Sequence, residues 1–154
     1  MTAPLSLHRA TSADIGSLLH LMLQMQLDDP WDESFDQLIV RHNLKELLHN
    51  PVYGLILLAR DGQIPVAYLA ICFDFSLEYR GKGAWVDELF VLPTHRGKGI
   101  ASQLLDLAES ASLESGAQTL HLEVTHGNSA IELYRRRGFI DHHRFLMTKW
   151  LKPI

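Results

Sequence analysis

One stretch of the chain, residues 84–101, constrains the fold more than any other. It reads Ala-Trp-Val-Asp-Glu-Leu-Phe-Val-Leu-Pro-Thr-His-Arg-Gly-Lys-Gly-Ile-Ala, an apolar strand pattern followed by a proline and two glycines. Pro93 ends the strand because proline cannot donate to a sheet ladder. Gly97 and Gly99 permit a tight turn that leaves backbone N–H groups accessible, and from Gly99 onward the apolar spacing is that of a helix with one buried face. The stretch therefore predicts a strand, a glycine-rich turn and a helix.

The start of this helix is predicted to bind an anion. A helix N-terminus behind a glycine-rich turn offers unpaired N–H groups and the positive end of the helix dipole, and Arg96 and Lys98 add positive charge. A P-loop would need Gly-x-x-x-x-Gly-Lys followed by Ser or Thr, which the chain lacks here. The dinucleotide fingerprint is matched only imperfectly by Gly97, Gly99 and Ser102.

Two motifs resemble those of the GNAT superfamily of acetyl-CoA-dependent N-acetyltransferases. Arg96, Gly99 and Ala101 match the family's pyrophosphate loop, which reads Arg or Gln, two residues, Gly, one residue, then Gly or Ala. Residues 128–139, Asn-Ser-Ala-Ile-Glu-Leu-Tyr-Arg-Arg-Arg-Gly-Phe, resemble a later family helix that ends in Tyr, three residues and Gly-Phe. Asn128, a suitable N-cap, lies one position nearer to the following Ala than in the family.

The resemblance implies acetyl-CoA as co-substrate and a set of residues that bind it. The backbone of Leu89–Val91 is expected to hold the pantetheine arm, and Tyr134 to protonate the departing CoA thiolate as general acid. The full set expected to contact acetyl-CoA is Leu89, Phe90, Val91, Arg96, Gly97, Lys98, Gly99, Ile100, Ala101, Asn128 and Tyr134.

Acetyl transfer to an alkylamine also calls for a base. An amine with a pKa near ~10.4 must lose a proton at a cost of roughly 4–5 kcal/mol at pH 7, against ~2 kcal/mol for expelling a thiol with a pKa near ~8.5. Asp87 is the first candidate for the base, because polyamine acetyltransferases of the superfamily carry an acidic residue at the matching position, and Glu88 is the second. Strand alternation places Asp87 on a face with Leu89 and Val91, and Glu88 on a face with Phe90. The alternative is that these carboxylates only bind the cationic amine or cap a loop.

The acceptor is expected to be a small cationic amine, polyamine- or aminoglycoside-like. Residues 28–36 hold five acidic residues and no Lys or Arg, and an aromatic ring among carboxylates can hold a cation. We expect the acceptor to contact Trp31, Glu33, Tyr79 and Asp87. A solvated acidic loop that caps the next helix is the structural alternative. A protein N-terminal or lysine acetyltransferase and a non-catalytic acetyl-CoA-binding sensor are the functional ones.

Composition narrows the class of protein. A length of 154 residues, 47% of them hydrophobic and 21% charged, predicts a single domain. The resemblance implies that this is one N-acetyltransferase domain over residues 1–154. A net charge of −4 argues against a nucleic-acid partner, and no apolar run reaches the ~20 residues of a membrane span. The single cysteine, Cys72, and a first segment unlike a signal peptide predict a cytoplasmic location. The nine histidines lack metal-ligand spacing, so no metal is expected.

The order of elements predicts an α/β fold, a single-domain GNAT-like mixed and mostly antiparallel sheet flanked by about four helices. The apolar run Phe145–Leu151 leaves room for a homodimer. The expected helices are one opened by Thr11 and Asp14, one over 35–48, one from Gly99 and one through Tyr134. The expected strands are 5–9, 52–59, 65–73, one through Asp87, 119–124, 139–140 and 143–150. A turn at Asp61-Gly62 is expected to join the second strand to the third, and a loop is expected over 76–83.

Overall fold

The computed structural model describes residues 5–31 and 34–152. The chain divides into two units, Met1–Glu123 and Val124–Ile154, and each is described by itself. The single domain expected from the sequence stays a prediction.

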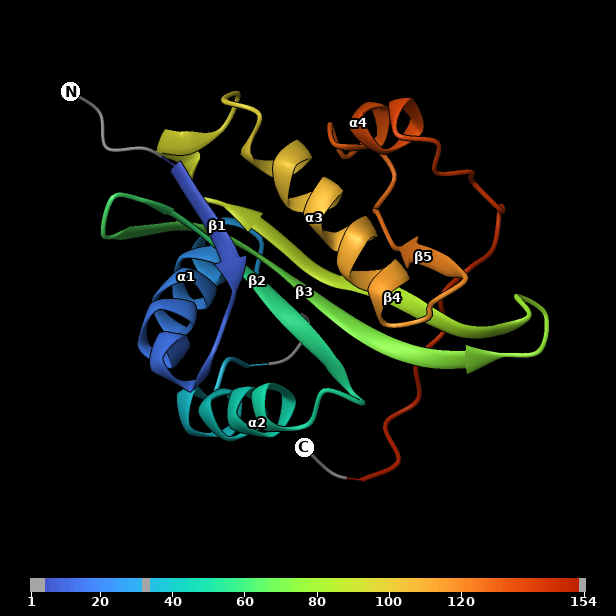
Figure 1. Ribbon diagram of the computed structural model, residues 1–154, viewed down its shortest axis with the longest axis horizontal. Helices are drawn as coiled ribbons and strands as arrows, with labels where there is room; N and C mark the ends of the chain where they lie inside the picture. The colour runs from blue at the N-terminus through green and yellow to red at the C-terminus, as the bar shows by residue number, and fades with distance from the viewer. Residues whose placement is uncertain (1–4, 32–33, 153–154) are drawn as a thin grey trace. The chain divides into compact units, whose positions relative to one another are not determined.

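The first unit is built on a five-stranded sheet in the order β1-β2-β3-β4-β5 (Figure 1). Its pairs are antiparallel except β4 with β5, which run parallel. The mixed, mostly antiparallel sheet predicted from the sequence is thereby confirmed. The strands are β1 (Leu5–Arg9), β2 (Gly54–Asp61), β3 (Ile64–Ser76), β4 (Gly81–Val91) and β5 (Thr119–Leu122).

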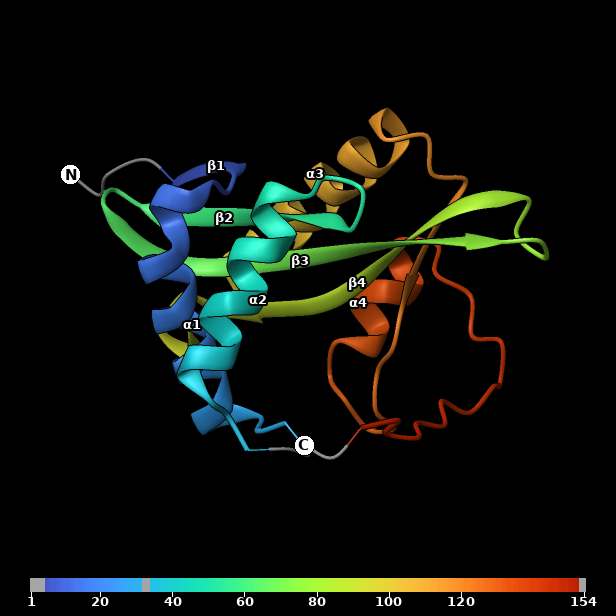
Figure 2. The same ribbon diagram turned by 90° about the horizontal axis from the view of Figure 1, so that it is seen from below.

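Helices cover both faces of this sheet. Figure 2 shows α1 (Ile15–Asp28) and α2 (Gln37–His49) on one face and α3 (Ile100–Glu114) on the other. Short 3₁₀ turns precede α1 (Ser12–Asp14) and α3 (Pro93–His95). None of the helices formed by residues 5–31 and 34–152 has the length and apolar character that crossing a membrane requires.

The N-terminal helix begins as its capping residues predict. The N–H of Thr11 donates to Asp14 Oδ2 over 2.9 Å, and the Thr11 hydroxyl shares the same acceptor. The apolar face of α1 is buried, and it packs with α2 on the side chains of β2, β3 and β4 that share that side of the sheet. This core cluster comprises Ala10, Ile15, Leu18, Leu19, Leu21, Met22, Met25, Val40, Leu44, Ile56, Leu58, Tyr68, Ala70 and Phe90.

Two hairpins order the sheet. The turn at Asp61-Gly62 is confirmed, with Gly62 at φ 59° between β2 and β3. The next hairpin is longer than predicted, because the pairing of β3 with β4 continues to Ser76 and Gly81. The loop expected over 76–83 is therefore reduced to the turn 77–80.

The second unit holds α4 (Ile131–Arg136). Asn128 does not occupy the N-cap position that the sequence suggested. The N-cap is Ala130, and the helix starts at Ile131. The Asn128 side chain instead accepts the N–H of Ala130 over 2.9 Å, which orders the turn before the helix. Gly138 follows the helix at φ 87°, the left-handed conformation expected of a residue that ends a helix.

The strands predicted over 139–140 and 143–150 are wrong. The structure describes this segment as far as residue 152 and forms no strand in it. Asp141 Oδ1 accepts the N–H of His143 over 2.7 Å, and His143 takes φ 51°, so a local turn breaks the extended run that the apolar pattern suggested. The apolar side chains beyond it are exposed, Phe145 by 90%. The strand expected over 119–124 is also shorter, ending at Leu122.

Candidate active site

The glycine-rich turn joins β4 to α3 in the conformation that the sequence predicted. Gly97 and Gly99 have φ angles of 72° and 77°, which other residues rarely adopt. A Cβ at either position would meet no atom within 4 Å, so the space in front of the turn is open. The first N–H groups of α3 have no acceptor within the helix. This turn therefore fits an anion bound through backbone donors, as the diphosphate of acetyl-CoA would be.

The Arg96 side chain has partners within the protein. Its Nε donates to the carbonyl oxygen of Val91 over 3.0 Å, and its Nη2 donates to Asp28 Oδ2. The guanidinium also lies 5.8 Å from the centre of the Phe90 ring. Arg96 thus links the end of β4 to the last residue of α1, and Arg96 and Lys98 are both exposed at the turn.

A β-bulge sets the positions of the two candidate bases. Glu88 pairs with Ala70 and Val86 pairs with Ile71, so Asp87 is an extra residue in β4 without a partner on β3. A bulge shifts the alternation of side chains along its strand. Beyond it the alternation is regular, and Glu88 and Phe90 share the face covered by α1, as predicted.

Glu88 is held in a network of hydrogen bonds. The hydroxyl of Tyr68 donates to Glu88 Oε2 over 2.8 Å, and the Trp31 side chain donates to the same carboxylate. Desolvation is the largest influence and raises the pKa of Glu88 to about 7, with the charge of Asp87 adding to the rise and the two hydrogen bonds opposing it. A carboxyl group with this pKa is poised to take up a proton near neutral pH.

Asp87 is more exposed than its neighbour. Partial desolvation raises its pKa, and the pKa of Glu123, just after β5, is raised by desolvation and by the charge of Asp87. Burial, then Asp87 and Glu88, raise the pKa of the Cys72 thiol to about 11, so the thiol stays protonated at neutral pH. The charge of Asp87 therefore acts on two other carboxyl groups, those of Glu88 and Glu123.

Two carboxylates of the acidic segment 28–36 make contacts within the protein. Asp28 pairs with Arg96, and Asp36 Oδ1 caps α2 by accepting the N–H groups of Leu38 and Ile39 over 2.8 and 3.3 Å. Glu33, expected to contact the acceptor, lies outside the described residues. The segment thus includes a helix cap, as the structural alternative proposed.

The two aromatic residues expected at the acceptor site lie in different clusters. Trp31 contacts Glu88 and packs against Phe35 with ring centres 5.3 Å apart. Tyr79 meets the His121 ring edge-on at 4.5 Å, and Trp85 lies against the same His121 at 4.8 Å. The structure therefore brings Trp31, and not Tyr79, into contact with a candidate base.

Tyr134, the candidate general acid, lies on α4 in the second unit. Its ring meets Phe139 edge-on at 5.8 Å, and its carbonyl oxygen accepts the N–H of Phe139 over 3.1 Å. Burial raises the pKa of Tyr134, which keeps the hydroxyl protonated at neutral pH. The role of Tyr134 as the general acid stays a prediction.

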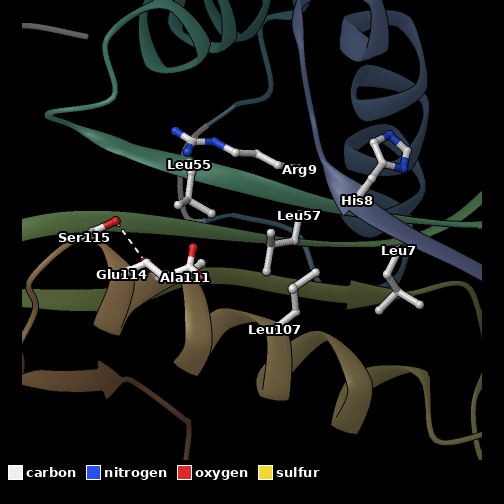
Figure 3. Close-up of a pocket in the computed structure, with 9 residues that line it drawn as sticks. All are labelled: Leu7, His8, Arg9, Leu55, Leu57, Leu107, Ala111, Glu114 and Ser115. Carbon is white, nitrogen blue, oxygen red and sulfur yellow. Dashed lines mark hydrogen bonds between the residues drawn. The ribbon is translucent and has the colours of Figure 1, made fainter.

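A separate pocket lies on the other side of the sheet (Figure 3), between β1, β2 and α3. It has a volume of about 380 Å³, with Leu57 and Leu107 among its apolar lining and Arg9 and Glu114 among its charged lining. The site residues predicted from the sequence and described by the structure are not among those that line it. In the same described part of the chain, no three His, Cys, Asp or Glu side chains gather as a metal ion would need.

Comparison with known proteins decides the family. The sequence model of the acetyltransferase (GNAT) family matches residues 18–139. The chain belongs to the GNAT acetyltransferase family. It is therefore an N-acetyltransferase that acts on amines, and the family uses acetyl-CoA.

Relatives span almost the whole of this GNAT acetyltransferase. The aminoalkylphosphonate N-acetyltransferase of Salmonella typhimurium is 29% identical over 94% of this chain and 90% of its own length. An integron cassette protein from the mobile metagenome of a salt marsh has a solved structure with a TM-score of 0.84 and 28% identity, covering 96% of this chain and 91% of its own. A predicted acetyltransferase of Clostridium acetobutylicum, solved with acetyl-CoA, shares the fold with a TM-score of 0.82, at 20% identity over 95% of this chain and 96% of its own.

Sequence reasoning missed Tyr68 in this GNAT acetyltransferase. Tyr68 stands in the buried run of β3 among aliphatic residues and reads there as a core residue. The available signal was its hydroxyl, because a buried Tyr usually finds a hydrogen-bond partner. Which partner it finds depends on the bulge at Asp87, and the apolar pattern of β4 does not reveal a bulge.

Proposed function

We propose that this chain transfers the acetyl group of acetyl-CoA directly to the amine of a small cationic molecule, polyamine- or aminoglycoside-like, with both substrates bound at once. Glu88 carries the proposal. Its carboxyl group is half-buried beside the bulge of β4, is hydrogen-bonded by Tyr68, and has a pKa raised to about 7. Glu88 rather than Asp87 is then the better candidate for the base, reversing the order that the sequence suggested.

The backbone of the turn over residues 96–101 fits the diphosphate of acetyl-CoA, which supplies the acetyl thioester. Leu89–Val91 follow the bulge and are assigned to the pantetheine arm. Glu88 accepts the proton that the acceptor ammonium loses, and it does so through the oxygen that Tyr68 does not occupy. Tyr134 donates its phenolic proton to the sulfur that leaves, and the second proton that the nitrogen loses as the amide forms restores the Tyr134 hydroxyl. Glu88 releases its proton to solvent, so each transfer yields the amide, the free CoA thiol and one proton.

Charge supports the choice of acceptor. Asp87, Glu88 and Glu123 are close enough for the charge of Asp87 to raise the pKa of each of the other two, so a bound cation would relieve their mutual repulsion. Trp31 is held against Glu88 and is 37% exposed, which leaves part of the ring for a cation. The Salmonella relative is named for a small amine that also bears a phosphonate, so net charge is the property to test.

The test is a thiol-release assay with a panel of amines at fixed acetyl-CoA. The panel contains spermidine, an aminoglycoside, an aminoalkylphosphonate and a peptide with a free N-terminus. We expect the highest kcat/KM for the polycationic amines, and a loss of most of it in Glu88→Gln. Equal rates for amines of different charge would refute the proposal that the acceptor is a small cationic amine. Absence of thiol release with every amine, together with no acetyl-CoA binding, would remove the function.

We also propose a cytoplasmic location, which the free thiol of Cys72 supports. A homodimer through the exposed apolar segment Phe145–Leu151 is proposed as well. Sedimentation of the purified chain at several concentrations tests the dimer, and a single monomeric species would remove it.

A further inference from the structure

Tyr68 is a fully buried polar residue with an acidic partner. It lies in the middle of β3, with 0% of its surface exposed, and belongs to the core cluster beneath α1. Its hydroxyl is 2.8 Å from Glu88 Oε2 and 3.3 Å from Met25 Sδ. A hydroxyl has one proton to donate, and a carboxylate is a much stronger acceptor than a thioether. The proton therefore goes to Glu88, and Met25 packs behind it.

The strand register fixes this contact. Tyr68 pairs with Phe90, and Ala70 pairs with Glu88, so Tyr68 reaches Glu88 on the diagonal between neighbouring rows. The small side chain of Ala70 leaves room for that reach. The rings of Tyr68 and Phe90 lie 6.4 Å apart, and Met25 closes the side toward α1. Because β3 and β4 are paired with each other both before and after this point, neither partner can move away easily.

We propose that Tyr68 is a positioning residue for Glu88: its hydroxyl fixes Oε2, directs the other carboxylate oxygen toward the acceptor amine and stabilises the ionised form that takes up the proton. This inference rests on the proposed role of Glu88 as the base. Tyr68 itself does not exchange a proton, because burial and the charges of Glu88 and Asp87 raise the pKa of its hydroxyl and keep it a donor.

The groups around Glu88 determine whether its pKa rises or falls when the Tyr68 hydroxyl is removed. Asp87 on the same strand raises the pKa of Glu88, and Cys72 on β3 faces both carboxylates as a neutral thiol. Trp31, between α1 and α2, and Tyr68, on β3, lower the pKa of Glu88 by donating hydrogen bonds. Removal of the Tyr68 hydroxyl therefore leaves burial and Asp87 less opposed, so the pKa of Glu88 must rise.

The test is Tyr68→Phe, which removes one oxygen and keeps the ring. We expect the acidic limb of the kcat/KM profile to move up by about one pH unit, since a hydrogen bond to a charged group is worth about one pKa unit or more. The rate at pH 7 should fall several-fold and approach that of the unmodified enzyme at pH 9, with the KM for acetyl-CoA unchanged. Tyr53→Phe, at an exposed tyrosine outside the site, is the matched control and should leave the profile unchanged.

A second substitution acts in the opposite direction and avoids doubt about folding. Replacement of Tyr68 with 3,5-difluorotyrosine keeps a hydroxyl that is a stronger donor, and it should move the acidic limb down. In both proteins, carbon-13 NMR of the Glu88 carboxyl group follows the same titration without turnover. The inference would be overturned if both variants kept the acidic limb of the kcat/KM profile and the titration midpoint of the Glu88 carboxyl group at the values of the unmodified protein.

The two proposals fail in different ways. If Glu88→Gln keeps full activity and the acidic limb, Glu88 is not the base and the proposed function needs revision. If Glu88→Gln abolishes the limb while Tyr68→Phe leaves it in place, only the positioning role of Tyr68 is refuted. In the Glu88→Gln background, Tyr68→Phe should have no further effect on the pH profile.

Discussion

The strongest prediction concerns the free energy of unfolding, which the ionised Glu88 carboxylate lowers. Folding raises the pKa of this group from 4.5 to about 7. The folded state therefore binds the proton more tightly than the unfolded state, and the free energy of unfolding falls as the pH rises from about 4.5 to about 7. At about 1.4 kcal/mol per pKa unit, the full cost above pH 7 is on the order of 3 kcal/mol.

Glu88→Gln should remove this cost, because the amide is neutral at every pH and its oxygen can still accept the Tyr68 hydroxyl. We expect the variant to be more stable than the unmodified protein by up to about 3 kcal/mol at pH 8, with the difference vanishing below pH 4.5. Urea unfolding monitored by fluorescence from pH 4 to pH 9 measures it. The control Glu114→Gln, at an exposed carboxylate, should stay within about 0.5 kcal/mol throughout. A Glu88→Gln difference that is flat with pH, or that grows toward low pH, would refute the reasoning.

Three further predictions concern activity and binding. Glu88→Gln should abolish the acidic limb of kcat/KM near pH 7, whereas Asp87→Asn should keep it; the reverse outcome would make Asp87 the base. Tyr134→Phe should lower kcat by about tenfold or more and leave the acetyl-CoA affinity in calorimetry unchanged; an equal loss of affinity would mean a binding role. Asp28→Asn should release Arg96 and tighten acetyl-CoA binding up to about fivefold, the range of an exposed ion pair. Asp29→Asn is its control, and an unchanged Kd would exclude Arg96 from the diphosphate site.

Local signals in the sequence predicted the elements of the first unit. Pro93 and the glycines after it marked the end of β4 and the start of α3, because each restricts or frees the backbone at its own position. The turn at Asp61-Gly62 and the cap formed by Thr11 and Asp14 are local in the same sense. Features of this kind are complete within a few residues, so a single sequence reveals them.

Features that depend on distant partners could not be predicted in this way. Residues 143–150 have an apolar pattern typical of a strand, but a strand also needs a neighbour, and the turn that Asp141 forms with His143 competes with extended backbone. The pKa of Glu88 depends on burial beneath α1 and on donors from Tyr68 and Trp31, which are 20 and 57 positions away along the chain. The candidate pair of Asp87 and Glu88 was therefore predictable, whereas the ranking within it was not.

The unpaired residue at position 87 divides β4 into two parts, and the alternation of side chains shifts from one part to the other. Trp85 and Glu88 point to the same side of the sheet although three positions separate them, because the bulge resets the count. A regular strand with the same residues would pair Asp87 with Ala70 and Glu88 with Leu69, which would turn the Glu88 carboxyl toward α3 and away from Tyr68. The reactivity of this strand thus depends on its register with β3 as much as on its composition.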